Sequence, residues 1–541
     1  MIDPAAPAAP WWQTGVIYQI YPRSFQDSDG DGIGDLRGIA ARLPYLAALG
    51  IDAVWLSPIF PSPMADFGYD VADYCDVDRA FGTLADLDAL VAAAHALNLR
   101  VLLDLVPNHS SSDHPWFRAS RSSRDDPKRD WYVWHDAAPG GGAPNNWTSD
   151  FGGSAWEWDA ATGQYYLHAF LKEQPDLNWR NPELRAAMMD VLRFWFARGI
   201  DGFRIDVLWH LVKHADFPDN PANPDWRPGV RDRDLVLQHH STDQPEVHAI
   251  AAEMRRIADE AGTADGRDRV LIGEIYLPYH RLMTYYGTAD APEVHLPFNF
   301  RLIGAEWTAR NVAAIIAEYE AALPDGAWPN WVLGNHDQPR LAGRIGEAQA
   351  RVAAMMLLTL RGTPTLYYGD ELGLAGELVP PGRIRDPQAL REPGVFNRDE
   401  ARLPMAWTSG TGAGFTTGDA WLPVPAEAAT RNVEAESADA ASLLSLTRAL
   451  LTLRRSSAAL RFGSIDQVHA DDDVLHYRRT DGEEHLVIVL NLRGAAHAYP
   501  VKSGSMTPVL STYPGQLPGT VGAGGSVPLR PDEGLILKVS A

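Results

Sequence analysis

The sequence predicts an α/β fold, a (β/α)8 TIM barrel in which eight parallel strands alternate with helices. Two observations support this prediction. Short apolar runs, each followed by a loop and then a helical pattern, recur along the chain, and this alternation is typical of parallel βαβ units. There are eight such runs, the number that closes a barrel; they cover residues 16–21, 53–56, 101–106, 203–205, 270–272, 294–296, 331–333 and 365–367. A doubly wound open sheet is the alternative, but no Gly-x-Gly-x-x-Gly turn opens a helix here.

Helical periodicity fills several of the spaces between these strands, in residues 84–97, 184–196 and 247–258. Two segments break the alternation. Residues 108–179 are aromatic and rich in Gly, Pro and Asn, so we expect a domain inserted after the third strand that overhangs the strand ends. Residues 212–244, with repeated Pro, Asp and Asn, form a second and smaller excursion.

The pattern changes near the carboxyl terminus. A helix is predicted there by leucines at positions 443, 446, 450 and 453. Strand-like runs at residues 474–477, 485–490 and 535–539 then predict an antiparallel β-domain packed on the barrel, with a Gly/Pro-rich loop at residues 515–525. The predicted boundaries are 1–107 and 180–458 for the barrel, 108–179 for the inserted domain and 459–541 for the β-domain.

The composition restricts the class of partner. A net charge of −23 over 541 residues argues against nucleic acid and against anionic membranes. No apolar stretch reaches the length of a membrane span, and the first ten residues have neither the basic nor the apolar region of a secretory signal. Cys75 is the only cysteine, so no intrachain disulfide can form and a reducing compartment is allowed. We therefore expect a soluble cytoplasmic protein, a monomer or a homodimer, that acts on a small molecule.

The chain is organised around residues 199–210. Within them a short buried strand ends on the carboxylate of Asp206, and Arg204 points to the same side because side chains alternate along a strand. A guanidinium in this position would keep Asp206 ionised and oriented, as a carboxylate nucleophile requires. From this stretch alone, a buried structural ion pair is an equal alternative.

Other acids and histidines stand at the ends of other predicted strands. Asp104 and His109 end the third strand, and Glu274 follows the fifth. His336 and Asp337 follow the seventh. Because these ends meet on one face of a barrel, three carboxylates would gather near a guanidinium, which suits glycosyl transfer through an oxocarbenium-like transition state. A divalent-metal hydrolase is the chemical alternative, but no His-x-His or His-x-x-x-His pair lies at these ends.

Four of these segments together resemble the four signature regions of glycoside hydrolase family 13, the α-amylase family. They are Asp-Leu-Val-Pro-Asn-His at residues 104–109, Gly-Phe-Arg-Ile-Asp at 202–206, Gly-Glu at 273–274 and Asn-His-Asp at 335–337. Their order and spacing also fit, and the likeness covers essentially the whole chain. The resemblance implies a barrel with an inserted B domain and a C-terminal β-domain, in agreement with the organisation predicted from the strands.

The resemblance also implies a role for each acid. Asp206 corresponds to the nucleophile, Glu274 to the general acid/base and Asp337 to the transition-state stabiliser. Donors around the reacting glucose are implied at Arg204, His109 and His336. The implied mechanism is retaining double displacement, for which the carboxyls of Asp206 and Glu274 lie roughly 5–5.5 Å apart. Glu274 must then be protonated at rest while Arg204 keeps Asp206 charged. We expect Asp104 to organise its neighbours rather than touch substrate.

Three further segments resemble the oligo-1,6-glucosidase and α-glucosidase group of that family. They are Gln-Pro-Asp-Leu-Asn-Trp at residues 174–179, Asp-Phe-Gly-Tyr at 66–69 and Arg-Asp-Glu-Ala-Arg-Leu-Pro-Met-Ala-Trp at 398–407. The likeness implies that Asp66, rather than the neighbouring Asp70, closes the pocket over the terminal glucose and that Tyr69 stacks on its ring.

The same likeness implies that the pocket is walled off behind one glucose, because Arg402 would pair with Asp66. A walled pocket means exo-action. Phe151 and Phe170 match aromatic positions near this subsite, although as isolated residues they would be assigned to the core.

The linkage preference is less defined. Val207, directly after the nucleophile, is the residue type seen in 1,6-specific members, but the Leu-Trp-His that follows departs from the common 1,6 pattern. One side chain seldom decides a difference of about 1–3 kcal/mol. We therefore expect an exo-acting retaining α-glucosidase that releases or transfers the terminal glucose of short α-glucosides such as maltose. An oligo-1,6-glucosidase and a glucosyltransferase or sucrose-active enzyme are alternatives, and a non-catalytic binding subunit is a distant one because all three acids are present.

The loop at residues 27–35 is a separate signal, with oxygen ligands at the spacing of a calcium loop. The ligands would be the carboxylates of Asp27, Asp29, Asp31 and Asp35 and the backbone carbonyl of Ile33. The twelfth position is Gly38, so the bidentate Glu of an EF-hand is missing. We expect a structural Ca²⁺, with Mg²⁺ as second choice, that pins the first βα loop. An acidic turn that caps a helix is the alternative.

Overall fold

The structure is a computed structural model that describes residues 9–227, 231–392, 394–515 and 517–540. Most of the N-terminal segment considered above, residues 1–8, lies outside the described residues. So do residues 228–230 of the predicted excursion and residue 516 of the predicted C-terminal loop.

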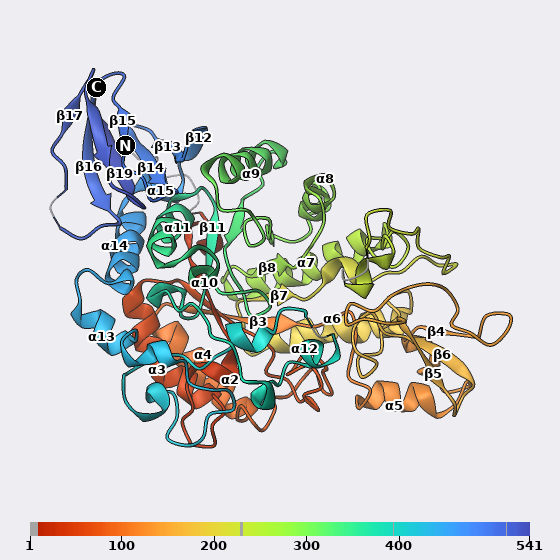
Figure 1. The fold of residues 1–541 in the computed structure, drawn as a ribbon. Coiled ribbons are helices and arrows are strands. Elements are labelled where there is room, and N and C mark those ends of the chain that lie inside the picture. The colour runs from red at the N-terminus through yellow and green to blue at the C-terminus, as the bar shows by residue number, and fades with distance from the viewer. Residues whose placement is uncertain (1–8, 228–230, 393, 516, 541) are drawn as a thin grey trace.

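Eight parallel strands form a nearly closed barrel, which confirms the predicted fold class (Figure 1). Their order is β10-β11-β1-β2-β3-β7-β8-β9, and each hydrogen-bonded pair is parallel. The strands are β1 Ile17–Ile20, β2 Ala53–Leu56, β3 Arg100–Leu105, β7 Gly202–Ile205, β8 Val270–Gly273, β9 Leu296–Pro297, β10 Asn330–Val332 and β11 Thr363–Tyr367. Each lies within two residues of the apolar run that predicted it.

The barrel strands are buried on both faces. One set of side chains, including Ile17, Trp55 and Leu102, fills the barrel interior. The residues that alternate with them, such as Tyr18 and Val54, pack outward in the main core beneath the surrounding helices. Double burial is expected for a parallel sheet covered by helices, and it explains why the strands read as continuous apolar runs.

Helices surround the barrel, and local sequence sets where they begin. Thr83 accepts a hydrogen bond from the N–H of Asp86, whose carboxylate accepts in return from the N–H of Thr83, and this capping box starts α4. The longer helices are α3 Leu36–Leu49, α4 Leu84–Ala96, α6 Pro182–Ala197, α7 Glu246–Asp265, α9 Ala309–Ala322 and α11 Glu347–Thr359. Short ones are α1 Trp11–Thr14, α2 Pro22–Phe25, α8 Tyr279–Leu282, α10 Leu341–Ile345, α12 Pro387–Arg391 and α13 Val433–Ala438.

Between β3 and β7 the chain forms a small antiparallel sheet in the order β4-β6-β5, from Trp134–His135, Gln164–Leu167 and Trp156–Asp159. It also contains a helix that the sequence pattern did not predict, α5 Pro115–Ser122. Only Phe117 and Ser120 of this helix are buried, so its eight residues carry too little apolar periodicity to be recognised.

The second interruption of the barrel pattern packs against the first. The Trp147 Nε1–H donates to the carbonyl of Pro218, and the side-chain amide of Asn146 donates to the carbonyl of Asn220. A 3₁₀ turn, Leu208–His210, precedes the excursion at 212–244, and the described part of the excursion contains another, Asp232–Leu235. The two segments therefore build one wall above the barrel.

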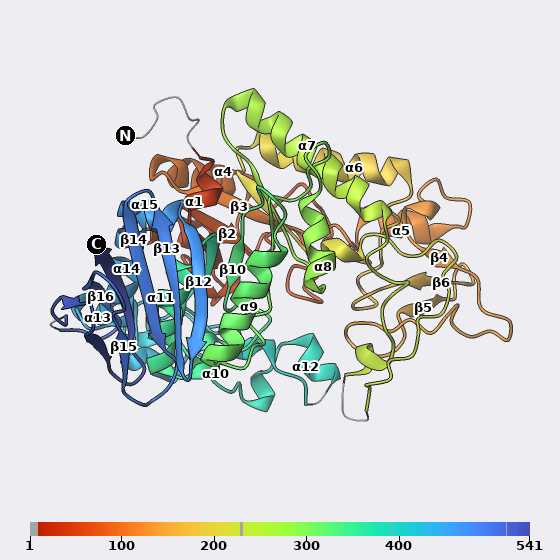
Figure 2. The same ribbon diagram turned by 90° about the horizontal axis from the view of Figure 1, so that it is seen from above.

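The carboxyl-terminal part is antiparallel, as predicted. After α14 Leu443–Ser456 and α15 Ala458–Arg461, the sheet order is β12-β13-β14-β19-β16-β17, with a separate pair β15-β18. The strands are β12 Ser464–Asp471, β13 Val474–Asp481, β14 Glu484–Asn491, β15 His497–Pro500, β16 Ser505–Ser511, β17 Val521–Gly522, β18 Ser526–Leu529 and β19 Gly534–Ser540. Figures 1 and 2 both show this sheet on the opposite side of the barrel from β4, β5 and β6. Across the described residues, no helix has the combined length and apolarity that a bilayer crossing needs.

Candidate active site

The carboxyl ends of the barrel strands bring the predicted acids to one end of the barrel. Asp206 follows β7 directly and Glu274 follows β8, whereas Asp104 lies near the end of β3. Asp104 is in register with Arg204 across β3 and β7, and Arg204 with Ile272 across β7 and β8. Side chains at the same level of neighbouring parallel strands therefore converge.

Arg204 is the centre of the acid cluster. Its Nη1 lies 2.7 Å from Asp104 Oδ1 and 2.6 Å from Asp206 Oδ1, and its Nη2 lies 2.7 Å from Glu274 Oε2. All four side chains are buried. A planar guanidinium can bond several carboxylates in fixed directions, so Arg204 orients the two acids predicted to react.

The surroundings of Asp206 shift its pKa upward, whereas the sequence expectation considered only the effect of Arg204. Burial raises the pKa of Asp206 well above its ordinary value, Arg204 opposes that rise, and the neighbouring carboxylates of Glu274 and Asp104 add to it. Arg204 therefore offsets only part of the effect of burial on the pKa of Asp206. Asp206 and Glu274 share this one guanidinium in a buried site, which holds their carboxyl groups next to each other.

The residue after Asp206 has a strained backbone. Val207 has a φ of 37°, in a left-handed region that β-branched residues rarely adopt. In this conformation its N–H donates to Glu274 Oε2 over 2.9 Å. The strain therefore aims a backbone donor at the predicted general acid/base.

Asp337 is held by two arginines from a distant part of the chain. Its Oδ1 lies 2.9 Å from Arg402 Nη2 and 3.4 Å from Arg398 Nη1. Burial opposes ionisation of Asp337, but His336, Arg402 and Arg398 together lower its pKa below the ordinary value. Asp337 is therefore a carboxylate at neutral pH.

The predicted pair between Asp66 and Arg402 is wrong. Asp66 Oδ1 lies 2.8 Å from Arg398 Nη2, whereas Arg402 bonds Asp337 and donates from Nε to the carbonyl of His336. Both arginines lie in one short turn, so sequence alone could not assign their partners. Asp386, fully buried, holds Arg398 Nη2 at 2.7 Å.

Asp66 and its neighbour Asp70 have different roles. Asp66 lines the cavity described below. Asp70 is fully buried and accepts the backbone N–H groups of Ala65 and Asp66, each over 2.9 Å. Asp70 therefore shapes the loop that presents Asp66, which agrees with the preference for Asp66 from its position in the motif.

Tyr69 and His336 form a stacked pair beneath the site. Their ring centroids are 5.5 Å apart at an interplanar angle of 2°, and the Tyr69 hydroxyl lies 2.7 Å from His336 Nε2. The same hydroxyl donates to Asp104 Oδ2 over 3.1 Å. Burial lowers the pKa of His336 to about 3, so His336 is neutral. Asp104 thus organises its neighbours, with bonds to Arg204 and Tyr69.

The aromatic residues predicted for the subsite also lie together. The Phe151 and Phe170 ring centroids are 6.1 Å apart, and Phe170 lies 5.2 Å from the ring of His109. Burial lowers the pKa of His109 to about 4. This cluster forms an apolar and uncharged side of the site.

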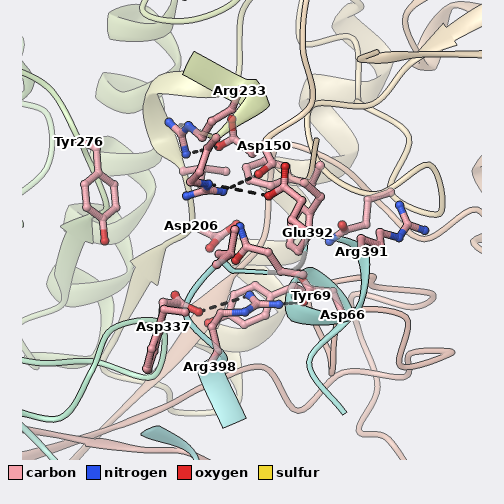
Figure 3. A pocket seen from close by; sticks show the side chains of 18 of the residues that line it. Asp66, Tyr69, Asp150, Asp206, Arg233, Tyr276, Asp337, Arg391, Glu392 and Arg398 are labelled. Carbon is pink, nitrogen blue, oxygen red and sulfur yellow. Dashed lines mark hydrogen bonds and ion pairs between the residues drawn. The ribbon is translucent and has the colours of Figure 1, made fainter. Parts of the chain in front are cut away.

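A cavity of about 920 Å³ opens over these groups (Figure 3). Eight of the predicted site residues line it: Asp66, Tyr69, His109, Phe151, Phe170, Asp206, Glu274 and Asp337. The other three, Arg204, His336 and Arg402, are not in its lining, and their contacts place them behind it. The volume is within the range of small-ligand sites.

The family model described as the alpha-amylase catalytic domain matches residues 19–463. The chain belongs to the α-amylase family. The resemblance stated from the four sequence segments is therefore confirmed, and the protein is a glycoside hydrolase of this family.

Relatives of this family member are similar over most of their length. A probable alpha-glucosidase of Rhizobium meliloti is 41% identical, with 91% of each chain covered. Maltase A1 of Drosophila melanogaster is 39% identical over 90% of this chain and 88% of its own. The oligo-1,6-glucosidase of Parageobacillus thermoglucosidasius is 36% identical over 89% and 90%.

Solved structures also match. The alpha-glucosyl transfer enzyme XgtA has a TM-score of 0.92 at 38% identity and covers 98% of this chain and 100% of its own. The trehalulose synthase MutB from Pseudomonas mesoacidophila has a TM-score of 0.89 at 34% identity, with 99% and 100% covered. The fold of this α-amylase family member is thus shared over the whole chain.

Sequence reasoning missed the residues at the mouth of the cavity. Arg233 and Asp150 form an ion pair of 3.0 Å there, and Arg231 Nη2 donates to the backbone carbonyl of Asp150. Figure 3 shows this pair above Asp206, with Glu392 beside it. These residues come from the two segments that interrupt the barrel pattern and from a late loop. In the sequence, the only indication that such residues could reach the site was the break in the strand–helix alternation. Tyr276, on another wall, stands two residues after Glu274.

The acidic loop of this family member is compact. Oxygens of Asp27, Asp29 and Asp35 lie within 4.8 Å of one another, and among the described residues Asp31 is not part of that group. Asp31 Oδ1 instead accepts the N–H of Ile33 over 2.7 Å. Positive φ values of 87° and 91° at Gly30 and Gly32 fold the loop back on itself.

Proposed function

We propose that the protein is an exo-acting, retaining α-glucosidase that removes the terminal glucose of short α-glucosides such as maltose. The observation that carries this proposal is the floor of the cavity, where Asp206 and Glu274 share the guanidinium of Arg204. Two carboxyls side by side in one buried site can supply both the nucleophile and the acid of a retaining glycosidase.

In the proposed mechanism Asp206 attacks the anomeric carbon and forms a covalent glucosyl ester. The glycosidic bond breaks as the carboxyl group of Glu274, acting as general acid, gives its proton to the departing oxygen. Glu274, now a carboxylate, removes a proton from water, which attacks the ester and releases Asp206. The ionised Asp337, held by Arg402, stabilises positive charge that develops on the sugar.

The exo-action is supported by the closed end of the cavity. Arg398 links Asp66 to Asp337, so the two acids and their arginine form a wall beside the predicted glucose subsite. A pocket closed on that side accepts a chain end and excludes the interior of a long chain. The relatives named alpha-glucosidase and maltase are consistent with this specificity.

The test is the anomeric configuration of the first product. Proton NMR at the start of maltose hydrolysis should show α-glucose in excess of what the already equilibrated reducing unit supplies, because double displacement retains configuration. Isomaltose and sucrose, tested in parallel, would establish the linkage preference. Initial release of the terminal glucose in the β configuration, or no glucose from any of the three, would overturn the proposal.

A glucosyltransferase is a second candidate, favoured by the similarity to an alpha-glucosyl transfer enzyme and to a trehalulose synthase. The glucosyl ester on Asp206 can be attacked by an alcohol or a sugar as well as by water. Product analysis with sucrose, and with maltose plus an alcohol, measures the ratio of transfer to hydrolysis.

We propose that the acidic loop holds a structural Ca²⁺, with Mg²⁺ as second choice. The donor set fits a hard cation, since Asp27, Asp29 and Asp35 present carboxylate oxygens within 4.8 Å of one another. Asp35 also accepts the N–H of Gly38 as the N-cap of α3, so the ion would connect the loop to a barrel helix. A cytoplasmic location remains a prediction that rests on the single Cys75.

A further inference from the structure

We propose that Lys213 is a positioning residue that fixes which ring nitrogen of His109 carries the proton, acting through the side-chain amide of Asn108. The proposal rests on the proposed function in one respect: it takes His109 as a ligand of the glucose in the cavity. The orientation of the ring itself follows from hydrogen-bond chemistry.

Lys213 is buried, with 3% of its surface exposed, and it joins three parts of the fold. Its Nζ lies 2.7 Å from Asn108 Oδ1, 2.5 Å from Asp176 Oδ2 and 2.5 Å from the carbonyl oxygen of His210. Asn108 follows β3, Asp176 ends the inserted segment, and His210 lies in the turn after Asp206. The three N–H groups of the ammonium therefore have three acceptors.

The ammonium dictates how the Asn108 amide is turned. Lys213 has only donors, so the atom of Asn108 that faces it must be the oxygen. The amide nitrogen of Asn108 then faces His109 Nδ1, 3.2 Å away. An amide NH₂ group only donates, so Nδ1 must accept and carries no proton.

The other ring nitrogen is in the opposite situation. His109 Nε2 lies 3.0 Å from the carbonyl oxygen of Tyr69, which can only accept, so Nε2 carries the proton and donates it. The amide nitrogen of Gln174 is also 3.1 Å from Nε2, because Gln174 Oε1 is committed to the N–H of Leu171. Two donors face each other there, and Gln174 adds no bond to the protonated Nε2.

This arrangement gives the cavity a neutral imidazole. His109 lines the cavity, and because its one N–H already points at the Tyr69 carbonyl, a sugar hydroxyl would share that proton in a bifurcated hydrogen bond. A second proton would set Nδ1–H against the Asn108 NH₂ group, so the cation is disfavoured. The charged groups that face His109 are Asp176 and Lys213, and the remaining neighbours Tyr69, Tyr74, Phe170 and Gln174 are uncharged at neutral pH.

Lys213 therefore acts twice on His109. It orients Asn108, and it neutralises Asp176, whose charge raises the pKa of His109 while burial and Lys213 lower it. Loss of the ammonium frees the amide to rotate and leaves a buried carboxylate near the ring. Both changes favour the imidazolium.

The sharpest variant is Asn108→Asp, which keeps the size of the side chain and its bond to Lys213 but replaces the NH₂ donor with an acceptor. Histidine ¹⁵N NMR should show His109 of the wild type protonated at Nε2 alone, with the signal assigned by its loss in His109→Gln. In Asn108→Asp the signal should show a proton on Nδ1 at neutral pH. The acid limb of kcat/KM for maltose should move to higher pH.

A second set of variants separates charge from shape. Lys213→Met should lower kcat/KM on the order of tenfold and shift the acid limb in the same direction. Lys213→Met combined with Asp176→Asn removes both charges and should return the acid limb toward that of the wild type. Lys172→Met, at an exposed lysine of the same inserted region, is the matched control and should change neither.

The outcomes separate this inference from the proposed function. A wild-type His109 with its proton on Nδ1, or an Asn108→Asp variant with unchanged tautomer and pH profile, would overturn the inference. If the Lys213 variants fail to fold, the wild-type and Asn108→Asp spectra still decide. An enzyme that releases no glucose from maltose would overturn the function, yet the NMR readings of the ring would stand.

Discussion

At the scale of single residues, the site is organised by arginines that each serve more than one acid. Arg204 gathers Asp206, Glu274 and Asp104, whereas Arg398 gathers Asp66, Asp337 and Asp386. Buried carboxylates need such partners, because an isolated buried charge costs several kcal/mol. The first arginine orients the two acids predicted to react, and the second acts together with His336 and Arg402 to lower the pKa of Asp337.

Substitution of Asp206 by Asn should abolish turnover and leave the fold intact. The amide cannot form the glucosyl ester, so kcat on maltose should fall on the order of 10⁴-fold or more. Circular dichroism and thermal unfolding should match those of the wild type. The control Asp113→Asn, at an exposed partner of Arg118, should retain full activity. Substantial residual turnover in Asp206→Asn would contradict the assignment of the nucleophile.

At the scale of elements, short segments of the inserted region depend on single side chains. Helix α5 has eight residues, and the residue before it, His114, is its N-cap. The Nδ1 of His114 accepts a hydrogen bond from the N–H of Trp116. Burial lowers the pKa of His114 to about 3, so the folded protein keeps this ring neutral as an acceptor. An N-cap of this kind supplies a partner that a short helix cannot provide for itself.

Because His114 caps α5 as a neutral ring, the free energy of unfolding should depend on pH. The unfolded chain binds a proton on His114 below its ordinary pKa of 6.5, and the folded chain does so only near pH 3. The contribution of His114 is therefore complete above pH 6.5 and is lost as the pH falls toward 3, at roughly 1.4 kcal/mol per pH unit. His114→Asn keeps an acceptor at the cap without titrating.

Urea unfolding of both proteins from pH 7 to pH 4 measures this effect. The free energy of unfolding of the wild type should fall relative to that of His114→Asn as the pH falls. A difference that stays constant at all pH values would reflect packing alone and would contradict the role of this histidine.

The acidic loop at residues 27–35 is the second element with a testable dependence. If it binds Ca²⁺, removal of the metal by a chelator should lower the melting temperature, and added Ca²⁺ should restore it. Metal analysis of the purified protein should find about one ion per chain, and Asp27→Asn should lose it. Asp31→Asn is the informative comparison, because Asp31 is outside the compact group. If the chelator leaves the melting temperature unchanged, the proposed metal site is wrong.

At the scale of the whole molecule, the barrel and the C-terminal sheet are joined by a buried cation that has no ion pair among the described residues. Arg479 of β13 is fully buried and donates to the carbonyls of Thr359 at the end of α11, Leu460 in α15 and Gly463. The last carbonyl groups of a helix have no hydrogen-bond donors within that helix. The Arg479 guanidinium supplies donors to the carbonyls at the ends of α11 and α15, and so connects these helices to the C-terminal sheet.

Arg479→Met should lower the free energy of unfolding by about 2–4 kcal/mol, because it leaves these buried carbonyls without donors. The adjacent Arg478 points to the other face of β13, is partly exposed and pairs with Asp466, so Arg478→Met should cost only about 0–1 kcal/mol. Denaturant unfolding of the two variants gives the comparison. Equal losses would mean that the buried cation does not join the two parts.

The sequence by itself determined the strands, their number and the residues at their ends. These features are local: apolar runs mark β3, β7 and β8, and Asp206 and Glu274 follow their strands directly. The four signature segments then identified the family, and Asp66, which the motif position favoured over Asp70, lines the cavity. In a closed barrel the carboxyl ends of all strands lie on one face. The prediction of the barrel was therefore enough to predict that these acids lie together.

Only the tertiary structure decided which charged groups pair. Arg398 rather than Arg402 bonds Asp66, and the wall at the cavity mouth joins Arg233 to Asp150 across two separate interruptions of the barrel. Helix α5 was missed because too few of its residues are buried. The pairing of these charged groups depends on contacts between segments far apart in the chain. Neither the periodicity of the sequence nor the spacing of its motifs predicts how two loops pack against each other.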